Sequence, residues 1–331
     1  MTTEHKHHLH LETSRKRPAH LHLTQELWDA AAKRHAELAS RLRVTIGWDG
    51  EILDEALKTA DFMINQLPPR EKLRERAPRL KWIQTTGAGL DAILPLDWLP
   101  PGITLTNNRG AHGEKAEDSC TLALLAIHTR LPAMIANQRE HVWKQILSAP
   151  IAGLTAVIIG FGDLGQGAGR AAAKLGLRVI AVTRSGKAGP PADETFAVSD
   201  LDRVLPRADF VVITTPLTSE TRGLLNRKRI GLIKSGAGFV NIGRGAIADY
   251  DALRERLERG ELAGAVLDVF YPEPLPADSP LWNTRNLIVT PHISCDNPAY
   301  IEQLLDRWFD NFERFLAGQP LQNAVDPKRG Y

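Results

Sequence analysis

Cysteines and long apolar segments are scarce in this sequence, and their scarcity excludes several classes of protein. The two cysteines, Cys120 and Cys295, lie far apart. This argues against a disulfide framework and favours a reducing, cytoplasmic setting. No apolar run approaches the roughly 18 residues of a membrane span, and no signal-peptide core lies near the start. We therefore expect no membrane partner.

An excess of charge of either sign is also lacking. The chain has 41 Lys and Arg residues against 39 Asp and Glu, a net charge of +2. Because nucleic-acid-binding proteins usually carry a concentrated basic stripe, we expect no nucleic-acid partner. The first ten residues hold four histidines: His5, His7, His8 and His10. A metal-binding tract is conceivable, but no cysteine or carboxylate cluster follows, so we interpret this segment as a frayed polar terminus and predict no metal site.

What the sequence does have is length and a repeating pattern. Its 331 residues exceed the roughly 250–300 at which one core stops growing, so two domains are expected. A long helix is predicted at 23–42, with Thr24 as its N-cap. Short apolar runs then alternate with polar-periodic stretches, which predicts strands at 43–47, 62–66, 80–86 and 103–107 and helices at 54–58 and 71–76. This alternation is typical of βαβ units and a parallel sheet.

A second and stronger set of strands follows a predicted helix at 114–127. Six strands, at 155–160, 178–183, 210–214, 238–242, 263–268 and 287–290, match a complete doubly wound sheet. An amphipathic helix at 300–316 comes after that sheet is complete, so we infer that it returns to the first domain. The predicted fold is α/β with two Rossmann-like domains. A dinucleotide-binding domain (111–294) is inserted in a discontinuous, flavodoxin-like substrate-binding domain (1–110 and 295–331).

The most specific motif is a glycine-rich turn between a predicted strand and a predicted helix. Gly160, Gly162 and Gly165 form a G-x-G-x-x-G pattern directly after the strand at 155–160. Gly160 permits the tight turn, Gly162 lets backbone N–H groups approach a pyrophosphate, and Gly165 lets helix and strand pack closely. Together with Asp163 and Leu164, this turn predicts a dinucleotide site whose phosphates face a helix N-terminus.

The end of the next strand bears on which nicotinamide cofactor binds. NAD-binding proteins usually end this strand with Asp or Glu, which accepts hydrogen bonds from the ribose. Here Thr183, Arg184 and Ser185 occupy the position, and no carboxylate is present. Thr and Ser can donate to a 2′-phosphate and Arg can pair with it, so we favour NADP(H). NAD stays the alternative, with Arg184 stacked on the adenine.

Polar residues stand at the ends of four further predicted strands, where open α/β sheets bind ligands. They lie in the segments 215–218, 241–245, 268–274 and 290–294. Reduction of a 2-keto acid needs an Arg to bind the carboxylate, a His to donate the proton and a carboxylate to orient that His. Arg244, His292 and Glu273 are the candidates. A surface ion pair for Arg244 and a turn cap for Glu273 are the structural alternatives, and order and context favour catalysis.

From about residue 62 onward the chain resembles the D-isomer-specific 2-hydroxyacid dehydrogenases. The segment 241–245 is similar to the catalytic-arginine motif of that family, 268–274 to its Asp-Val-Phe-x-x-Glu-Pro pattern and 290–293 to its Thr-Pro-His-Ile. The resemblance implies that Arg244, Glu273 and His292 are catalytic and that Asp268 holds the nicotinamide carboxamide. It also implies cofactor contacts at Thr215, Pro216 and Ile242.

Upstream segments add to the resemblance. The segment 85–91 is similar to the family loop whose backbone amides, here those of Ala88 and Gly89, hold the substrate carboxylate, and glycine permits such close approach. The segment 107–117 is similar to the family's interdomain hinge, and the stretch near 138–143 is similar to its extended dimerisation arm. A homodimer is therefore expected.

The resemblance leaves the substrate open. In having Thr183 where NAD-dependent relatives have an Asp, the chain is most similar to the NADPH-preferring glyoxylate and hydroxypyruvate reductases. This similarity implies a small 2-keto acid as substrate. A dehydrogenase for a bulkier 2-keto acid is one alternative. A nicotinamide-gated, corepressor-like binding protein of the same fold, which shares the Arg-Glu-His set, is another. Turnover on keto acids distinguishes an enzyme from such a binding protein.

Overall fold

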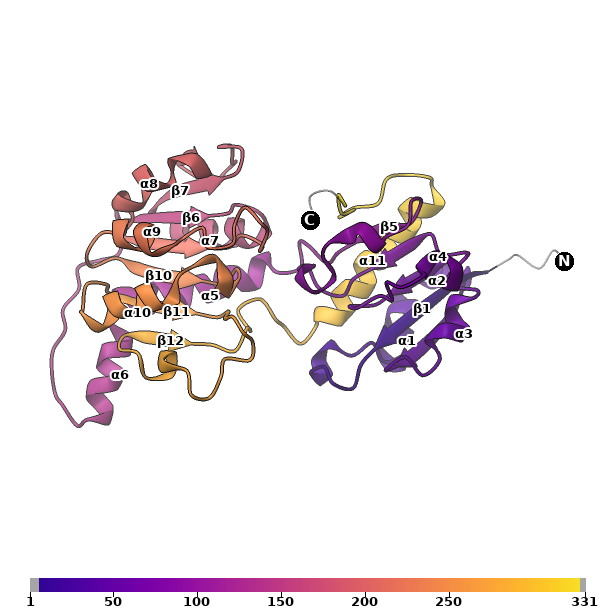
Figure 1. Ribbon diagram of the computed structural model, residues 1–331, viewed down its shortest axis with the longest axis horizontal. Helices are drawn as coiled ribbons and strands as arrows, with labels where there is room; N and C mark the ends of the chain where they lie inside the picture. The colour runs from indigo at the N-terminus through magenta and orange to yellow at the C-terminus, as the bar shows by residue number, and fades with distance from the viewer. Residues whose placement is uncertain (1–5, 328–331) are drawn as a thin grey trace. The chain divides into compact units, whose positions relative to one another are not determined.

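The computed structural model describes residues 6–327, which divide into two compact units. The discontinuous unit comprises Met1–Ala111 and Asn297–Tyr331, and the inserted unit comprises His112–Asp296. Each unit contains one parallel sheet with helices packed against it (Figure 1). These two sheets and the insertion confirm the predicted α/β class.

The discontinuous unit is built on five parallel strands in the order β2-β1-β3-β4-β5, the flavodoxin-like order. The strands are β1 (His7–Thr13), β2 (Leu42–Trp48), β3 (Phe62–Ile64), β4 (Trp82–Gln84) and β5 (Thr104–Thr106). One face of the sheet packs against α1 (Gln25–Arg34), α2 (Ala36–Ser40) and α11 (Tyr300–Leu316). The short helices α3 (Leu53–Leu57) and α4 (Leu73–Arg76) contribute to a second cluster.

Helix α11 completes the core of this unit from the far end of the chain. Most of its apolar side is buried, and Trp308 stacks on Trp82 of β4 with ring centroids 5.1 Å apart. The predicted return of this helix to the first domain is therefore confirmed, with the predicted bounds.

Two predictions at the N-terminus are wrong. The histidine-rich segment is not frayed, because His7–Thr13 forms a strand between β2 and β3. His5 lies outside the described residues. The single helix predicted at 23–42 is two helices, interrupted at His35, whose ring stacks on Phe309 at 4.5 Å. Its beginning was predicted correctly, since the Thr24 side chain accepts a hydrogen bond from Leu27 N.

The inserted unit holds seven parallel strands rather than the predicted six, in the order β12-β11-β10-β9-β6-β7-β8. They are β6 (Thr155–Ile159), β7 (Arg178–Thr183), β8 (Glu194–Ala197), β9 (Phe210–Ile213), β10 (Gly238–Asn241), β11 (Gly264–Leu267) and β12 (Leu287–Val289). The missed strand is β8, a half-buried edge strand with mixed polarity. The order reverses between β6 and β9, which is where doubly wound sheets bind ligands.

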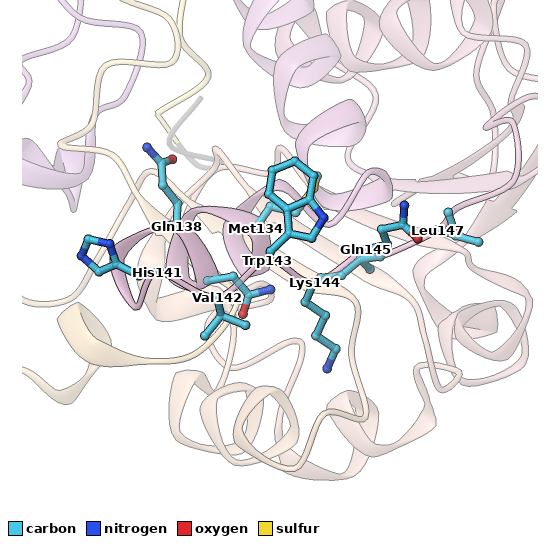
Figure 2. Close-up of a pocket in the computed structure, with 10 residues that line it drawn as sticks. Met134, Gln138, His141, Val142, Trp143, Lys144, Gln145 and Leu147 are labelled. Carbon is cyan, nitrogen blue, oxygen red and sulfur yellow. The ribbon is translucent and has the colours of Figure 1, made fainter.

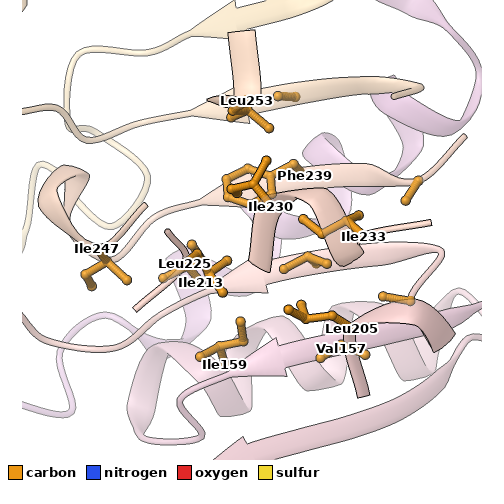
Figure 3. Close-up of a cluster of buried hydrophobic side chains, with 14 of the residues drawn as sticks. Val157, Ile159, Leu205, Ile213, Leu225, Ile230, Ile233, Phe239, Ile247 and Leu253 are labelled. Atoms are coloured by element: carbon orange, nitrogen blue, oxygen red, sulfur yellow. The ribbon is translucent and has the colours of Figure 1, made fainter. Parts of the chain in front are cut away.

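Helices cover both faces of this sheet: α5 (Gly113–His128), α7 (Asp163–Lys174), α8 (Leu201–Val204), α9 (Arg227–Leu232) and α10 (Tyr250–Glu258). The helix α6 (Leu131–Arg139) has no buried residue and is not part of either core cluster of this unit. Figure 3 shows the cluster on one face, which includes Ile159, Ile213 and Phe239 from three neighbouring strands and Leu253 of α10. In the described residues no single helix is long and apolar enough to cross a membrane, although α5 and α6, bent by 64°, pass such a test when joined.

Candidate active site

The glycine-rich turn links β6 to α7. Gly160 has φ +91°, a conformation that favours glycine, and a Cβ on Gly165 would lie 2.3 Å from the carbonyl oxygen of Gly160. Both positions therefore require glycine for the fold itself. Gly162 differs, because no described atom lies within 4 Å of where its Cβ would be. Glycine at 162 leaves open space at the N-terminus of α7.

The surroundings of this turn fit a dinucleotide. The hydroxyl Oγ1 of Thr215, just after β9, is buried and has no hydrogen-bond partner among the described residues. A Cβ on Gly160 would lie 2.8 Å from the Thr215 methyl group, so the two loops are in close contact. The predicted contacts Pro216 and Ile242 follow β9 and β10, and Leu164 lies in the first turn of α7. An unpaired donor and an uncovered helix N-terminus are suited to a phosphate group.

The end of β7 forms a tight polar turn. The Thr183 hydroxyl accepts a hydrogen bond from Lys187 N and donates one to Lys187 O, both at 3.1 Å. Arg184, Ser185 and Lys187 are exposed around this turn. The turn therefore presents cationic and hydroxyl groups, and no carboxylate is part of it.

The centre of the site is a hydrogen-bonded pair, His292 and Glu273. His292 Nδ1 donates to Glu273 Oε2 at 2.8 Å, while Glu273 Oε1 accepts from Phe270 N at 2.7 Å. The imidazole side chain is 49% exposed, so it is held in place and still accessible. Because Nδ1 is engaged, Nε2 is the nitrogen available to a substrate.

Electrostatics favour the charged form of both partners. The hydrogen bond to Glu273 raises the pKa of His292, and this outweighs the opposing effect of burial. Burial raises the pKa of Glu273, but the hydrogen bonds from His292 and Phe270 lower it further, so the net pKa is below the ordinary value. The shifts of both pKa values therefore favour a protonated imidazole held by a carboxylate, as a proton donor requires.

Arg244 belongs to the same neighbourhood, since its positive charge lowers the pKa of both Glu273 and His292. It follows β10, and its backbone oxygen accepts from Asn241 Nδ2 at 3.0 Å. A Cβ on the next residue, Gly245, would lie 2.4 Å from the backbone carbon of Phe270. This close approach of two backbones brings the arginine loop beside the glutamate loop.

Asp268 has a role in the structure that the sequence did not indicate. It is 1% exposed, and its carboxylate accepts hydrogen bonds from Thr290 Oγ1 at 2.5 Å, Ile293 N at 3.0 Å and Ser294 N at 3.0 Å. Its backbone oxygen also accepts from His292 N at 2.8 Å. These bonds hold His292 at φ +54°, a conformation that costs energy for a non-glycine residue.

Helix α5 fixes the other end of the histidine loop. Ser119 Oγ donates to Ser294 O at 2.7 Å, and His112 Nδ1 donates to Cys295 O at 3.2 Å. His112 N also donates to Asp163 Oδ2 of the glycine-rich turn at 3.1 Å. Sequence reasoning missed Ser119 and His112, because their side chains donate to backbone oxygens that no side-chain pattern reveals.

The segment that contains Ala88 and Gly89 lies in the discontinuous unit. Among the described residues, the amides of Ala88 and Gly89 donate to no protein acceptor, and both residues are half-buried. The loop itself is held rigidly, because Asn107 Nδ2 donates to Ala88 O and Asn108 N donates to Gly87 O. Two adjacent unpaired amides in a fixed loop can receive an anion.

Comparisons with known proteins give the family. Residues 121–294 match the model of the NAD-binding domain of the D-isomer-specific 2-hydroxyacid dehydrogenases. The chain is 31% identical over 281 residues to glyoxylate/hydroxypyruvate reductase B of Pectobacterium atrosepticum, a match covering 82% of this chain and 88% of that protein. The chain belongs to the D-isomer-specific 2-hydroxyacid dehydrogenase family. This dehydrogenase is thus an NAD(P)-dependent oxidoreductase of 2-hydroxy acids, as its motifs predicted.

Solved structures agree with this assignment. A D-isomer-specific 2-hydroxyacid dehydrogenase from Xanthobacter autotrophicus, in complex with NADPH and MES, has a TM-score of 0.84 and 31% identity, with 98% of this chain and 99% of that chain covered. An NADPH-dependent glyoxylate/hydroxypyruvate reductase from Sinorhizobium meliloti, in complex with NADP and sulfate, has a TM-score of 0.81 and 28% identity, with 98% and 100% covered. They confirm the predicted fold of the dehydrogenase.

Proposed function

We propose that this dehydrogenase reduces a small 2-keto acid, of the size of glyoxylate or hydroxypyruvate, to the D-2-hydroxy acid with NADPH. The observation that carries the proposal is the His292–Glu273 pair, an accessible imidazole hydrogen-bonded to a carboxylate beside Arg244 at the carboxyl ends of the strands. Relatives named glyoxylate/hydroxypyruvate reductase support the small substrate.

Each catalytic residue has one task in the proposed reaction. His292 Nε2 donates a proton to the keto oxygen, and Glu273 keeps the imidazole charged and oriented through Nδ1. Arg244 binds the carboxylate and polarises the keto group. The nicotinamide, when bound, supplies the hydride. Asp268 contributes by holding the histidine loop. We assign its contact with the nicotinamide carboxamide to Oδ2, because this oxygen accepts only one hydrogen bond from the described residues, that from Ser294 N.

The substrate carboxylate is proposed to bind the amides of Ala88 and Gly89. Their lack of protein acceptors within residues 6–327 supports this role. A carboxylate has two oxygens with several lone pairs, so it can accept from both amides.

The preference for NADPH rests on the turn after β7. A 2′-phosphate carries negative charge, and the exposed Arg184, Ser185 and Lys187 can all interact with it favourably. Thr183 supports the turn through its hydrogen bonds to Lys187. The same turn lacks the carboxylate that would accept from the ribose of NAD, so NAD is the weaker alternative.

The experiment that tests the proposal follows nicotinamide absorbance with purified protein and glyoxylate, hydroxypyruvate or pyruvate, each with NADPH and with NADH. We expect NADPH oxidation with the small acids. A preference for NADH would contradict the cofactor assignment and leave the chemistry standing. Turnover only with larger keto acids would contradict the substrate class, and no turnover with any keto acid would contradict the enzymatic proposal.

We further propose that the protein forms a homodimer through α6 and the segment that follows it. The helix ends at Arg139, and the pocket in Figure 2 is lined by Met134 and Gln138 of the helix and by the chain beyond it. Trp143 is 96% exposed and Leu147 is 91% exposed, which is unusual for large apolar side chains unless a partner covers them. We expect light scattering to give twice the chain mass, and a Trp143→Ser, Leu147→Ser double variant to give the monomer mass.

A reducing compartment such as the cytoplasm is proposed as the location. Cys120 and Cys295 are both free thiols in the structure. Burial raises the pKa of Cys120 to about 12 and also raises that of Cys295, so neither is a reactive thiolate.

A further inference from the structure

We infer that Gln66 selects 2-keto acids whose third carbon carries an oxygen substituent over those that carry a methyl group, and that Arg17 positions it for this task. The inference rests on the proposed function and adds the chemistry of the substrate's side chain to it. Its basis is a hydrogen-bond chain with a defined direction, which ends beside the two amides proposed to bind the substrate carboxylate.

The chain starts at Arg17, in the segment after β1. Arg17 Nη1 donates to Thr86 Oγ1 at 2.8 Å. A guanidinium has only donors, so the Thr86 hydroxyl accepts here and its own hydrogen is directed elsewhere. That hydrogen is donated to Gln66 Oε1 at 2.7 Å.

A second donor fixes the same oxygen. Gly87 N donates to Gln66 Oε1, also at 2.7 Å. Two donors on one atom determine which end of the amide is the oxygen, an assignment that otherwise depends on context. A flipped amide would set Nε2 against both donors. The orientation of Gln66 is therefore determined by Arg17 through Thr86 and by the backbone of Gly87.

The consequence is that the Nε2 group of Gln66 stays available to a ligand, because only Oε1 is engaged by the described residues. Within the described chain Nε2 donates to no protein acceptor, and it lies 3.3 Å from the position that a Cβ on Gly87 would occupy. Gly87 directly precedes Ala88 and Gly89. A substrate whose carboxylate binds those two amides would thus meet an amide donor at its next carbons.

The Nε2 donor distinguishes substrates by the group that their third carbon places against it. A hydroxyl or carboxylate oxygen on the third carbon can accept from Nε2, whereas a methyl group would leave the donor without water and without a partner. Leaving a buried donor unpaired costs about 1–3 kcal/mol, which corresponds to roughly a 5- to 150-fold loss in kcat/KM. Since Gln66 is half-buried, we expect the lower part of this range, about tenfold.

The test is a comparison of hydroxypyruvate with pyruvate in Gln66→Met, whose side chain has a similar shape and no donor. The two keto acids differ in intrinsic reactivity, so the measured quantity is the change in the ratio of their kcat/KM values relative to the natural protein. We expect this ratio to fall about tenfold, chiefly through KM for hydroxypyruvate. Gln303→Met, an exposed position on α11, is the matched control and should leave the ratio unchanged.

Arg17→Met tests the positioning role, and it should lower the same ratio in the same direction by a smaller factor. Loss of activity on both keto acids by an equal factor in Gln66→Met, with the ratio unchanged, would overturn the inference while the proposed function stands. A ratio that falls as far in Gln303→Met would overturn it as well. No turnover with any keto acid in the natural protein would instead contradict the proposed function, and the inference with it.

Discussion

Two glycines of the same motif should fail for different reasons when each is changed to alanine. In Gly165→Ala the new methyl group would lie 2.3 Å from the Gly160 carbonyl oxygen and 2.9 Å from its carbon. Overpacking against side chains costs about 1–3 kcal/mol, and a backbone neighbour cannot rotate away, so we expect at least the upper part of this range. For a unit of this size each kcal/mol lowers Tm by about 2–4 °C, which predicts a fall of roughly 6–12 °C.

Gly162→Ala should behave in the opposite way. Its backbone, at φ −76° and ψ −154°, is accessible to alanine, and no described atom lies within 4 Å of the new Cβ. The Tm without ligand should therefore stay within about 1 °C. The methyl group instead fills the space through which a pyrophosphate would approach the N-terminus of α7.

Thermal unfolding with and without NADPH separates the two effects. At a concentration 100 times Kd, NADPH should stabilise the natural protein by about 2.7 kcal/mol, a rise in Tm of roughly 5–11 °C. Gly162→Ala should lose most of this rise at the same concentration. A full ligand-induced rise in Gly162→Ala would show that the open space is not the pyrophosphate site. A Gly165→Ala protein as stable as the natural one would refute the close-packing argument.

Three further predictions concern the protonation and placement of histidines. Glu273→Gln keeps an acceptor for His292 Nδ1 but removes the negative charge that helps to raise the imidazole pKa. Keto-acid reduction needs protonated His292 and is lost as pH rises through that pKa, so the alkaline limb of the kcat profile should move to lower pH. An unmoved limb would exclude His292 as the titrating acid. His292→Ala should lower kcat about 10²–10⁴-fold while leaving the NADPH-induced rise in Tm unchanged, and retention of most activity would make another group the proton donor. Burial, together with Arg43 and His10, lowers the pKa of His8 from its ordinary value of 6.5 to about 4, so the neutral form is favoured in the folded protein. The free energy of unfolding should therefore fall as pH drops from 6.5 towards 4, by about 2 kcal/mol at most after solvent screening. Denaturant titrations of His8→Gln should lack this part of the pH dependence.

The parts of the site that could be predicted from the sequence are those in which a motif and a strand end coincide. Arg244, Glu273 and His292 follow three neighbouring strands of one parallel sheet, so the topology alone brings their loops together. The glycine-rich turn was equally accessible, since its residues and its strand–helix context occur in one continuous segment. The local sequence pattern was sufficient to predict these residues, because in a parallel sheet the carboxyl ends of all strands lie at the same edge.

What could not be predicted are contacts to the backbone from distant segments. The bond from Ser119 to the oxygen of Ser294 and the bond from His112 to that of Cys295 join the first helix of the inserted unit to its last loop. Every residue type has a backbone oxygen, so the residue types at 294 and 295 do not reveal that their backbone oxygens accept these hydrogen bonds. Asp268 was noticed in a motif, yet its three internal donors become apparent only when the loop at 290–294 is folded over it.

The missed first strand has a different cause, which lies in how a buried polar face is satisfied. Leu9 and Leu11 point to one core of the discontinuous unit, and their alternation with histidines is a strand pattern of period two. The four histidines instead suggest a frayed polar terminus, because no cysteine or carboxylate cluster follows them in the sequence. Here His8 Nε2 and His10 Nδ1 share the hydroxyl of Thr45 on the neighbouring strand, and His10 Nε2 is bound to Glu12 at 2.8 Å. The partners that permit burial come from β2, from Glu12 two residues further along the same strand, and from Thr59, whose hydroxyl bonds His8 Nδ1. The sequence of a strand whose polar face is buried therefore resembles that of a strand whose polar face is exposed to solvent. The two differ in the residues on the neighbouring strands, and these can be identified only when the pairing register is known.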